Sequence, residues 1–327
     1  MGAAMLRTAL CEAFGIDHPI VQAGMGPFGS GAGLAAAVSN AGAIGTVGGS
    51  ARPLDGLRSE LAMVRELTDR PFIVNFTLPY LQESPEAFDA ALEARPPVVS
   101  CALGDPGDLV QRAHDGGARF MQQVHTVEQA ELVAGRGVDV IIAQGTEAGG
   151  FTGRVAMQVL VPQVVDAVSP IPVLAAGGIA DGRGLAAALV LGASGVNVGT
   201  RFLASEESSI GEAWKRAIVE ARAEDAVKVG VWDSIFPKPG GGAFDVTPRA
   251  LRTAFIERWE MRPDEAAADA ERLGEEIASA VYENRMEEFV PFTGQVVGLI
   301  DAVRTAAQIV QDMVRVAEDT LRRTAAI

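Results

Sequence analysis

The feature that most constrains this chain is one pattern that repeats through its N-terminal two thirds. Short runs of small and β-branched apolar residues alternate with longer stretches, rich in Ala, Leu and Glu, that have helical spacing. The runs occupy residues 19–23, 43–47, 72–76, 98–102, 120–124, 140–144, 172–176 and 195–198. They are apolar almost throughout, which is typical of parallel strands that helices cover on both faces. The order therefore predicts βα units around a parallel sheet.

Eight consecutive units predict a closed (β/α)8 barrel, the TIM-barrel architecture. A doubly wound open sheet has the same alternation of strands and helices. The barrel is favoured because eight units leave no strand for an edge. Glycine clusters also recur at the carboxyl ends of strands along the whole pattern, where a barrel gathers its functional loops.

The repeating pattern stops after Phe202. Residues 206–291 are rich in charge, contain all three tryptophans and include a Pro/Gly segment at 237–242 that predicts a loop. The rest of this stretch has helical spacing, and an apolar helical period returns at 294–326. We therefore assign residues 1–205 and 292–327 to the barrel with a closing C-terminal helix, and residues 206–291 to a mostly helical insertion or cap.

The composition narrows the classes of partner. The chain has 42 acidic against 27 basic residues, a formal net charge of -15, which disfavours nucleic acid and anionic membrane surfaces. No apolar run approaches the roughly 20 residues that a membrane span requires. Cys11 and Cys101 lie far apart without a C-x-x-C partner, so we interpret both as small buried residues. We expect a cytoplasmic protein that acts on small molecules, and a homo-oligomer is compatible with the sequence.

Two glycine clusters follow the seventh and eighth predicted strands, at residues 175–179 and 197–201. The loops after these strands of a TIM barrel commonly hold a phosphate, because glycines let backbone N–H groups approach it and a following helix adds a positive dipole. The alternative is that the glycines only permit tight βα turns. Their occurrence together, at this pair of strands, favours a phosphate site.

Amide side chains stand in or near the ends of other strands. Asn75 lies in the third predicted strand, and Gln144 ends the sixth, just before the sequence Gly-Thr-Glu-Ala-Gly-Gly. An amide in an apolar strand needs a hydrogen-bond partner, and a flavin ring with alternating donors and acceptors would supply one. The alternative is that Asn75 and Gln144 bond neighbouring backbone groups.

Five segments in combination resemble the nitronate monooxygenase family, formerly called 2-nitropropane dioxygenases, which includes the flavin-dependent enoyl-acyl carrier protein reductase of type II. The segments are His-Pro-Ile-Val-Gln-Ala-Gly-Met-Gly (18–26), Ala-Val-Ser-Asn-Ala-Gly (37–42), Gln-Gly-Thr-Glu-Ala-Gly-Gly (144–150), Ala-Ala-Gly-Gly-Ile-Ala-Asp-Gly (175–182) and Val-Gly-Thr-Arg-Phe (198–202). The likeness covers residues 18–208 and resumes near 294–295. It implies a TIM barrel that contains FMN.

The resemblance also implies roles for individual residues. Residues expected to approach or bind the flavin ring and ribityl chain are Gly24, Met25, Gly26, Asn75, Gln144 and Gly149. Residues expected around the phosphate are Gly177, Gly178, Asn197, Val198, Gly199 and Thr200. No G-x-G-x-x-G fingerprint for a nicotinamide cofactor opens a helix after a strand. Any NAD(P)H is therefore expected to bind transiently as an electron donor.

One position departs from the family. The family carries a histidine, the presumed base, in the loop after Glu-Ala-Gly-Gly, and this chain has Phe151 there. A phenyl ring cannot transfer a proton, so general-base chemistry must use another residue or be absent. His125, which ends the fifth strand, is the candidate replacement, although a lone histidine there also fits a helix cap. Glu147 and Tyr80 are further candidates.

The cap offers cations for an anionic substrate such as a CoA thioester. These are Arg201, Lys215, Lys238 and Arg249, with Phe236 and Phe244 as an apolar lid around the glycine run. The alternative is a solvated cap with scattered charges.

The leading hypothesis is an FMN-dependent oxidoreductase that oxidises a nitronate-like substrate, or uses NAD(P)H to reduce an electron-poor acceptor such as a quinone. The alternatives are an NAD(P)H-dependent ene-reductase for an unsaturated acyl thioester and a flavin-binding protein without turnover.

Overall fold

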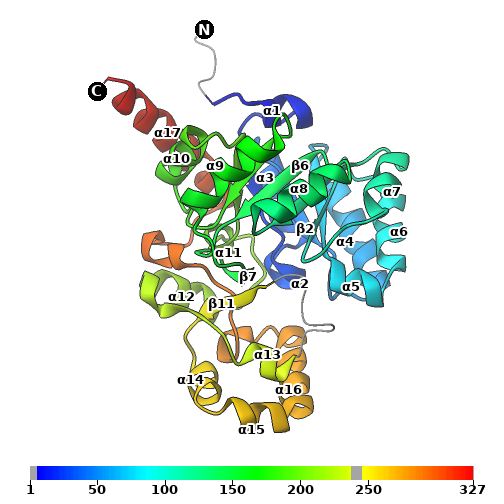
Figure 1. Ribbon diagram of the computed structural model, residues 1–327, viewed down its shortest axis with the longest axis vertical. Helices are drawn as coiled ribbons and strands as arrows, with labels where there is room; N and C mark the ends of the chain where they lie inside the picture. Colours follow the sequence, from blue (N-terminus) through cyan, green and yellow to red (C-terminus); the bar gives the residue numbers. More distant parts are fainter. Residues whose placement is uncertain (1–5, 237–244, 327) are drawn as a thin grey trace.

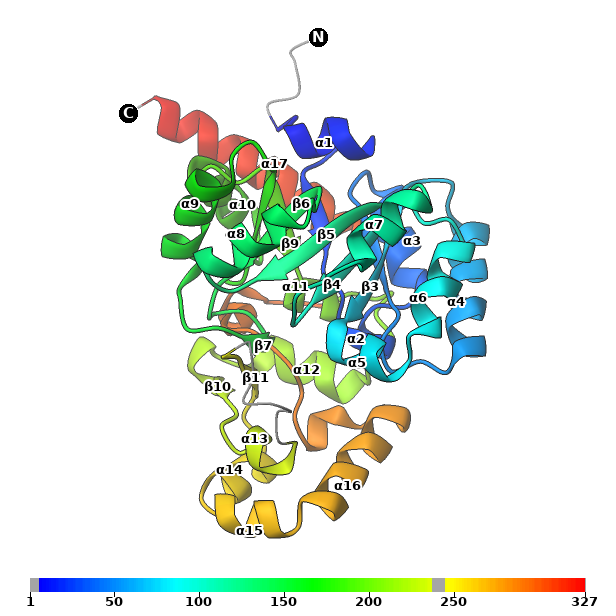
Figure 2. The same ribbon diagram turned by 45° about the vertical axis from the view of Figure 1, so that its right-hand side comes forward.

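The computed structural model describes residues 6–236 and 245–326. Eight parallel strands form a barrel, and helices cover its outside (Figures 1 and 2). The strands are β1 (Ile20–Gln22), β2 (Gly45–Gly48), β3 (Phe72–Thr77), β4 (Val98–Ala102), β5 (Arg119–Val124), β6 (Val140–Gln144), β8 (Val173–Ala176) and β9 (Gly195–Val198). Each predicted apolar run contributes one of them, so the predicted TIM barrel is confirmed.

The barrel closes between its first two strands. The sheet runs in the order β1-β9-β8-β6-β5-β4-β3-β2, and a parallel bridge between Val21 and Ile44 joins its two ends. Gln22 donates its backbone N–H to the Ile44 carbonyl at 2.9 Å, and Ile44 donates to the Ile20 carbonyl at 3.0 Å. Closure leaves no unpaired strand edge among these eight strands.

Side chains fill the barrel and block one of its ends. The interior cluster includes Val21, Ile44, Ile73, Met121, Ile142 and Leu174, all buried. Helix α1 (Ala9–Phe14) adds Leu10, Cys11 and Phe14 to this cluster. Figure 1 shows α1 at the end of the barrel away from the cap. Any site must therefore lie at the other end, where the strands finish.

Two of the helices around the barrel begin at polar residues that the sequence predicts as caps. Thr126 accepts a hydrogen bond from the Gln129 backbone, and Asp181 accepts one from the Arg183 backbone. The helices around the barrel are α2 (Gly26–Gly29), α3 (Ala32–Asn40), α4 (Leu54–Leu67), α5 (Leu78–Glu83), α6 (Glu86–Glu93), α7 (Leu109–Asp115), α8 (Val127–Gly135), α9 (Met157–Val168), α10 (Gly182–Val190) and α11 (Thr200–Leu203).

The insertion lies across the mouth of the barrel and is mostly helical, as predicted (Figure 2). Its helices are α12 (Glu212–Glu220), α13 (Trp232–Ile235), α14 (Ala254–Glu260), α15 (Pro263–Ala268) and α16 (Ala270–Tyr282), with short 3₁₀ turns η1 (Ala223–Asp225) and η3 (Met286–Glu288). Apolar residues from most of these elements form a second core.

Two segments of the insertion are strands, which the sequence analysis did not predict there. Strands β10 (Ala226–Lys228) and β11 (Thr247–Leu251) pair antiparallel, and β11 also pairs with β7 (Gly150–Thr152) in the loop after β6. These strands are short, and β11 pairs with a loop about 100 residues earlier in the chain, so local spacing carries little signal for them. The small sheet joins the cap to the barrel.

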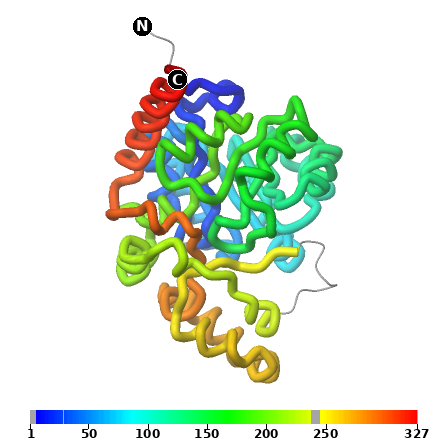
Figure 3. Tube along the Cα trace, turned by 60° about the vertical axis from the view of Figure 1, so that its left-hand side comes forward, coloured from blue at the N-terminus to red at the C-terminus, as the bar shows by residue number. Residues whose placement is uncertain are grey.

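The chain then returns to the barrel through η4 (Gln295–Leu299) and ends in α17 (Ala306–Ala325), the predicted closing helix (Figure 3). Thr305 and Gln308 form a capping box at the start of α17. Gly182 of α10 lies against the backbone of α17, which a larger side chain would prevent. Among the described residues, no helix is long and apolar enough to cross a membrane.

Candidate functional site

A cavity of about 370 Å³ lies between the carboxyl ends of the barrel strands and the cap. The barrel contributes the ends of its strands and the loops that follow them. The cap and the return segment contribute apolar side chains from Trp214, Val281, Met286, Phe292 and Val296. This volume lies within the range of about 300–1,000 Å³ that is typical of ligand pockets. The residues that the sequence singled out for cofactor contact all line this cavity.

The two glycine clusters meet on one wall of the cavity. Gly177 and Gly178 follow β8 with φ of 91° and 72°, in the left-handed region that favours glycine. Gly199 follows β9 and precedes α11. Within the described part of the chain, no backbone carbonyl accepts from the amide of Gly178 or Gly199. Free backbone donors from two neighbouring loops are suited to an anion. Asn197, Val198 and Thr200 line the same wall.

Strands β3, β4, β5 and β6 each place one polar side chain near their carboxyl ends in the cavity wall. These side chains are Asn75, Ser100, Gln123 and Gln144. Asn75 donates to the hydroxyl of Ser100 at 2.8 Å, and a Cβ on Gly24 would overlap the Asn75 amide. The Asn75 side chain is therefore held between β4 and the loop after β1. Gln123 and Ser100 were not singled out from the sequence.

A buried network of hydrogen bonds supports the loop after β1. Gln22 is buried outside the cavity lining, accepts from the Thr46 backbone at 2.8 Å and donates to Ser30 at 2.9 Å. Ser30 in turn accepts from the Met25 backbone at 2.8 Å. This network supports the turn that carries Gly24, Met25 and Gly26 into the cavity wall.

The loop after β6 packs on the return segment. A Cβ on Gly149 would lie 2.7 Å from the Gly294 nitrogen, so only glycine permits this approach. Gly294 also donates its N–H to the Thr200 hydroxyl at 3.0 Å. The Glu147 carboxylate accepts from the Met157 backbone at 3.1 Å and so caps α9. Gly149 therefore lines the cavity and also allows the two segments to pack closely.

Phe151 stands at the cap side of the cavity in an aromatic cluster. Its ring centroid lies 5.7 Å from that of Trp232 and 5.6 Å from that of Phe292. Phe236 stacks behind Trp232 at 4.6 Å. The backbone of Phe151 is fixed because it pairs with Pro248 in β11. Such contacts each contribute about 0.5–1.5 kcal/mol beyond simple burial, so the ring is held as a rigid apolar wall.

The cavity is poor in groups that transfer protons. Among the described residues that line it, only Glu147 and Cys101 carry an ionisable side chain. Glu147 is engaged at α9, and burial raises the pKa of the Cys101 thiol far above its usual range. Tyr80 lies outside the lining and donates to the Arg52 carbonyl at 2.9 Å. Glu147 is therefore the one carboxylate among the described lining residues, and it is held at the start of α9.

His125 lies behind this wall rather than at an open rim. The side chain is 1% exposed and does not line the cavity. Its Nε2 lies 2.9 Å from Oε1 of Gln144, which does line the cavity. Burial lowers the pKa of His125, partly opposed by the hydrogen bond to Gln144 and by the Phe151 backbone. This position gives the ring contact with the cavity only through Gln144.

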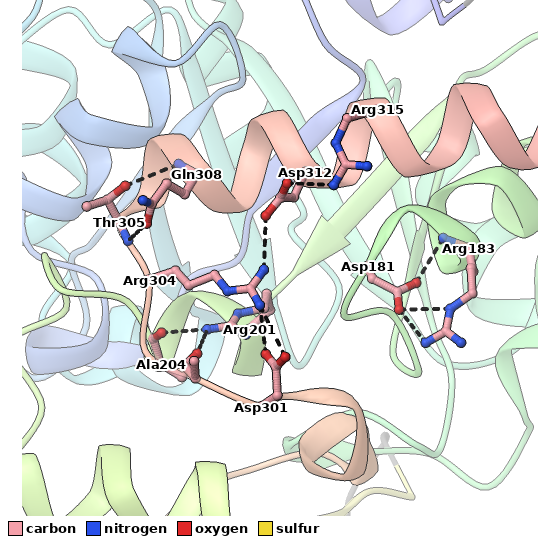
Figure 4. Close-up of polar contacts among 11 residues, drawn as sticks. Asp181, Arg183, Arg201, Ala204, Asp301, Arg304, Thr305, Gln308, Asp312 and Arg315 are labelled. Atoms are coloured by element: carbon pink, nitrogen blue, oxygen red, sulfur yellow. Dashed lines mark hydrogen bonds and ion pairs between the residues drawn. The ribbon is translucent and has the colours of Figure 1, made fainter.

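The predicted substrate-binding cations have structural partners instead. Arg201 is buried and donates to the carbonyls of Ala204 at 2.7 Å and Ala302 at 2.6 Å (Figure 4), and burial lowers its pKa to about 10. Arg249 donates to the Ala226 carbonyl at 2.6 Å. Lys215 forms an ion pair with Glu212 at 3.2 Å. None of the three lines the cavity, whereas Lys238 and Phe244 lie outside the described residues.

A lysine that the sequence did not indicate holds the loop of Phe151. Lys228 in β10 donates to the Thr152 hydroxyl, to the Thr152 carbonyl at 2.9 Å and to the Gly153 and Thr247 carbonyls at 3.1 Å. Burial, reinforced by Arg249, lowers the pKa of Lys228 to about 8. The sequence also did not predict that apolar residues of the cap line the cavity, because only the tertiary structure brings them over the barrel mouth.

Comparison with known families agrees with this geometry. The model of a family described as "Nitronate monooxygenase" matches residues 7–93 and 84–315. A curated relative is the (3aS,4S,5R,7aS)-5-hydroxy-7a-methyl-1-oxo-octahydro-1H-indene-4-carboxyl-CoA dehydrogenase of Mycobacterium tuberculosis. It is 38% identical over 257 residues, which cover 78% of this chain and 69% of the relative.

Two solved structures resemble the chain over nearly its whole length. FabK from Thermotoga maritima superimposes with a TM-score of 0.89 at 35% identity, covering 98% of this chain and 99% of FabK. The nitroalkane oxidase from Streptomyces ansochromogenes superimposes with a TM-score of 0.81 at 26% identity, covering 98% of this chain and 100% of the other.

Proposed function

Because this chain belongs to the nitronate monooxygenase family, whose members are oxidoreductases, we propose that it binds FMN in the cavity and exchanges two electrons with a small organic molecule. Bound FMN would supply the redox chemistry, since it takes electrons from a donor and returns them to an acceptor. The protein would contribute binding, orientation and a dry environment.

The residues of the cavity fit this cofactor. The unpaired amides of Gly178 and Gly199 would hold its phosphate, with Asn197 and Thr200 beside them. The side chains of Asn75 and Gln144 would bond the polar groups of the ring or ribityl chain. Met25 and the glycines of the same loop would pack against it. These groups converge on one cavity although they come from strands far apart in the sequence.

The observation that carries the choice of reaction is the wall around Phe151. Its ring is apolar, and the one carboxylate among the described lining residues, Glu147, is engaged at the start of α9. A neutral nitroalkane must lose a carbon-bound proton before it can be oxidised, and this wall cannot accept that proton. The substrate donor should therefore arrive as a preformed nitronate, or as NAD(P)H, which gives up hydride without a base.

An absorption spectrum followed by anaerobic reduction tests the proposal. The purified protein should be yellow or take up added FMN, and the flavin bands should bleach with propyl nitronate or with NAD(P)H. Neutral nitropropane should bleach them far more slowly. Protein that stays colourless with excess FMN would refute the cofactor, and equal rates with nitropropane and propyl nitronate would refute the absence of a base.

A second candidate function is the reduction of an unsaturated acyl thioester with NAD(P)H. It is favoured by the apolar wall that Trp214, Met286 and Phe292 add from the cap side, since such a wall suits an acyl body. The relatives named FabK and the carboxyl-CoA dehydrogenase are consistent with this class of substrate. Consumption of NADPH that begins only when an enoyl thioester is added would support it. Bleaching by neither reductant would instead indicate a flavin-binding protein without turnover.

A further inference from the structure

The further inference concerns Arg52, a largely buried side chain between β2 and α4 that no step above uses. The side chain is 12% exposed. Its Nε donates to the Gly48 carbonyl at the end of β2 at 2.7 Å, and its Nη2 donates to the Pro27 carbonyl in α2. A guanidinium can only donate and a carbonyl oxygen can only accept, so the direction of both bonds is fixed. Arg52 therefore links α2 to the end of β2.

Two neighbouring helices hold Arg52 in place. Its Nη1 lies 3.2 Å from Oε1 of Glu60 in α4, and Oε2 of Glu60 accepts from the Ala32 backbone N–H at 2.6 Å. On the other side, the Tyr80 hydroxyl in α5 donates to the Arg52 carbonyl at 2.9 Å. Arg52 and Glu60 together thus bind the chain within α2, at Pro27, and just after it, at Ala32.

Helix α2 depends on such contacts because it is short. It has four residues, far fewer than the roughly 12 that an isolated helix needs to be even marginally stable. It packs tightly on β2, since the Gly48 N–H donates to the Ser30 carbonyl at 2.8 Å and a Cβ on Gly48 would lie 2.3 Å from the Gly26 carbonyl oxygen. The place of α2 is therefore set by β2 and by the two carbonyl bonds of Arg52.

This corner of the molecule belongs to the cavity wall. Gly26, Pro27 and Gly29 line the cavity, and Figures 1 and 2 show α2 at the end of the barrel that faces the cap. Ala51, next to Arg52, also lines it and has a φ of 59°, in the left-handed region that a residue with a Cβ adopts only at a cost. Such strain persists where surrounding contacts hold the backbone, as those of Arg52 do.

We propose that Arg52 is a positioning residue that holds α2 against the bound flavin. The inference rests on the proposed binding of FMN in the cavity. The side chain itself does not line the cavity and acts through the backbone that does. The wall at residues 24–29 is then in place before the cofactor arrives, so binding does not have to order it.

Hydrogen exchange of the apoprotein tests whether Arg52 holds α2. Arg52→Met keeps a flexible apolar side chain and removes the bonds to both carbonyls. We expect amides at residues 24–32 to exchange about tenfold faster, because the local opening that exchange requires becomes easier, and amides of α17 to keep their rates. Arg58→Met in α4 is the matched control, since Arg58 is 49% exposed and its removal changes the net charge equally. It should alter neither region.

FMN affinity then tests whether this hold serves the cofactor. The dissociation constant should rise about tenfold in Arg52→Met and stay unchanged in Arg58→Met. Arg52→Lys keeps the positive charge but lacks the planar fork that reaches two carbonyls, so its affinity should lie within about threefold of Arg52→Met. Glu60→Gln should give a smaller loss, and it should add nothing in the Arg52→Met background.

Three outcomes would overturn the positioning role. These are unchanged exchange at residues 24–32 in Arg52→Met, exchange that rises equally in α17, and full FMN affinity in Arg52→Lys, which would show that only the charge matters. If Arg52→Met does not fold, Glu60→Gln takes its place in the exchange experiment, with the same expected and contrary results. Wild-type protein that binds no FMN would refute the proposed function, whereas exchange in the apoprotein reports on Arg52 without the cofactor.

Discussion

The charge of a side chain at position 178 provides the sharpest test of the phosphate site. A Cβ placed on Gly178 would have Glu147 as its nearest neighbour at 3.9 Å, so a short side chain fits without collision. The φ of 72° lies in the left-handed region, which costs roughly 1–2 kcal/mol for a residue with a Cβ. Asp and Asn tolerate this region best and have nearly the same shape. Gly178→Asn is therefore the matched control for Gly178→Asp.

The difference between the two variants isolates the electrostatic effect. A carboxylate about 4 Å from one unit of phosphate charge costs about 4 kcal/mol at an effective dielectric constant of 20. That cost corresponds to a loss of FMN affinity of about a thousandfold. Gly178→Asn has the backbone cost without the added charge, and we expect its FMN affinity to fall by about thirtyfold at most.

The assay is a titration of each folded apoprotein with FMN, followed by the quenching of flavin fluorescence. Thermal melting of the apoproteins provides the control, because the carboxylate that Gly178→Asp introduces would also face the carboxylate of Glu147. High salt should narrow the gap between the variants, since it screens the repulsion. Equal affinities for the Asp and Asn variants would refute the placement of the phosphate at the loops after β8 and β9.

Three further predictions follow from the site. Phe151→His should raise the rate of flavin reduction by nitropropane relative to propyl nitronate, and an unchanged ratio of rates in stopped-flow reduction would show that the residue at this position is not a base. The variant should also melt a few degrees lower, because it loses aromatic contacts with Trp232 and Phe292 that are each worth about 0.5–1.5 kcal/mol. Gly24→Ala should weaken FMN binding about tenfold, because the new methyl group displaces Asn75 from Ser100. Gly33→Ala in α3, where the added methyl group has open space, is the control. Equal FMN affinities of the two variants would contradict the close packing of Gly24 on Asn75. The pKa of Lys228 is about 8 in the folded protein against 10.5 ordinarily, so its charged form destabilises the fold and this penalty is relieved as the pH rises from 8 to 10.5. Urea unfolding of the wild type and of Lys228→Met should show the wild type gaining about 1 kcal/mol relative to the variant across that window, and a relative loss would refute the assignment.

The sequence by itself determined the barrel and marked several of its residues that line the cavity. Strands buried on both faces are apolar throughout, and eight of them with helices between leave little choice of fold. Glycines at positions 177, 178 and 199 were recognisable because a tight approach of backbone to ligand excludes side chains. Residues such as Asn75 and Gln144 were recognisable because an amide in an apolar strand must find a partner.

Only the tertiary structure shows which residues of the cap line the cavity. The pairing of β11 with β7 joins the cap to the barrel mouth. The assembled fold thereby places Trp214, Met286 and Phe292 in the cavity wall. The spacing of apolar residues reports which face of a helix is buried but not what it is buried against. For the same reason the sequence could mark His125 as a candidate and could not tell that its ring turns away from the cavity toward Gln144. Contacts between distant segments depend on the assembled fold, and local patterns do not encode them.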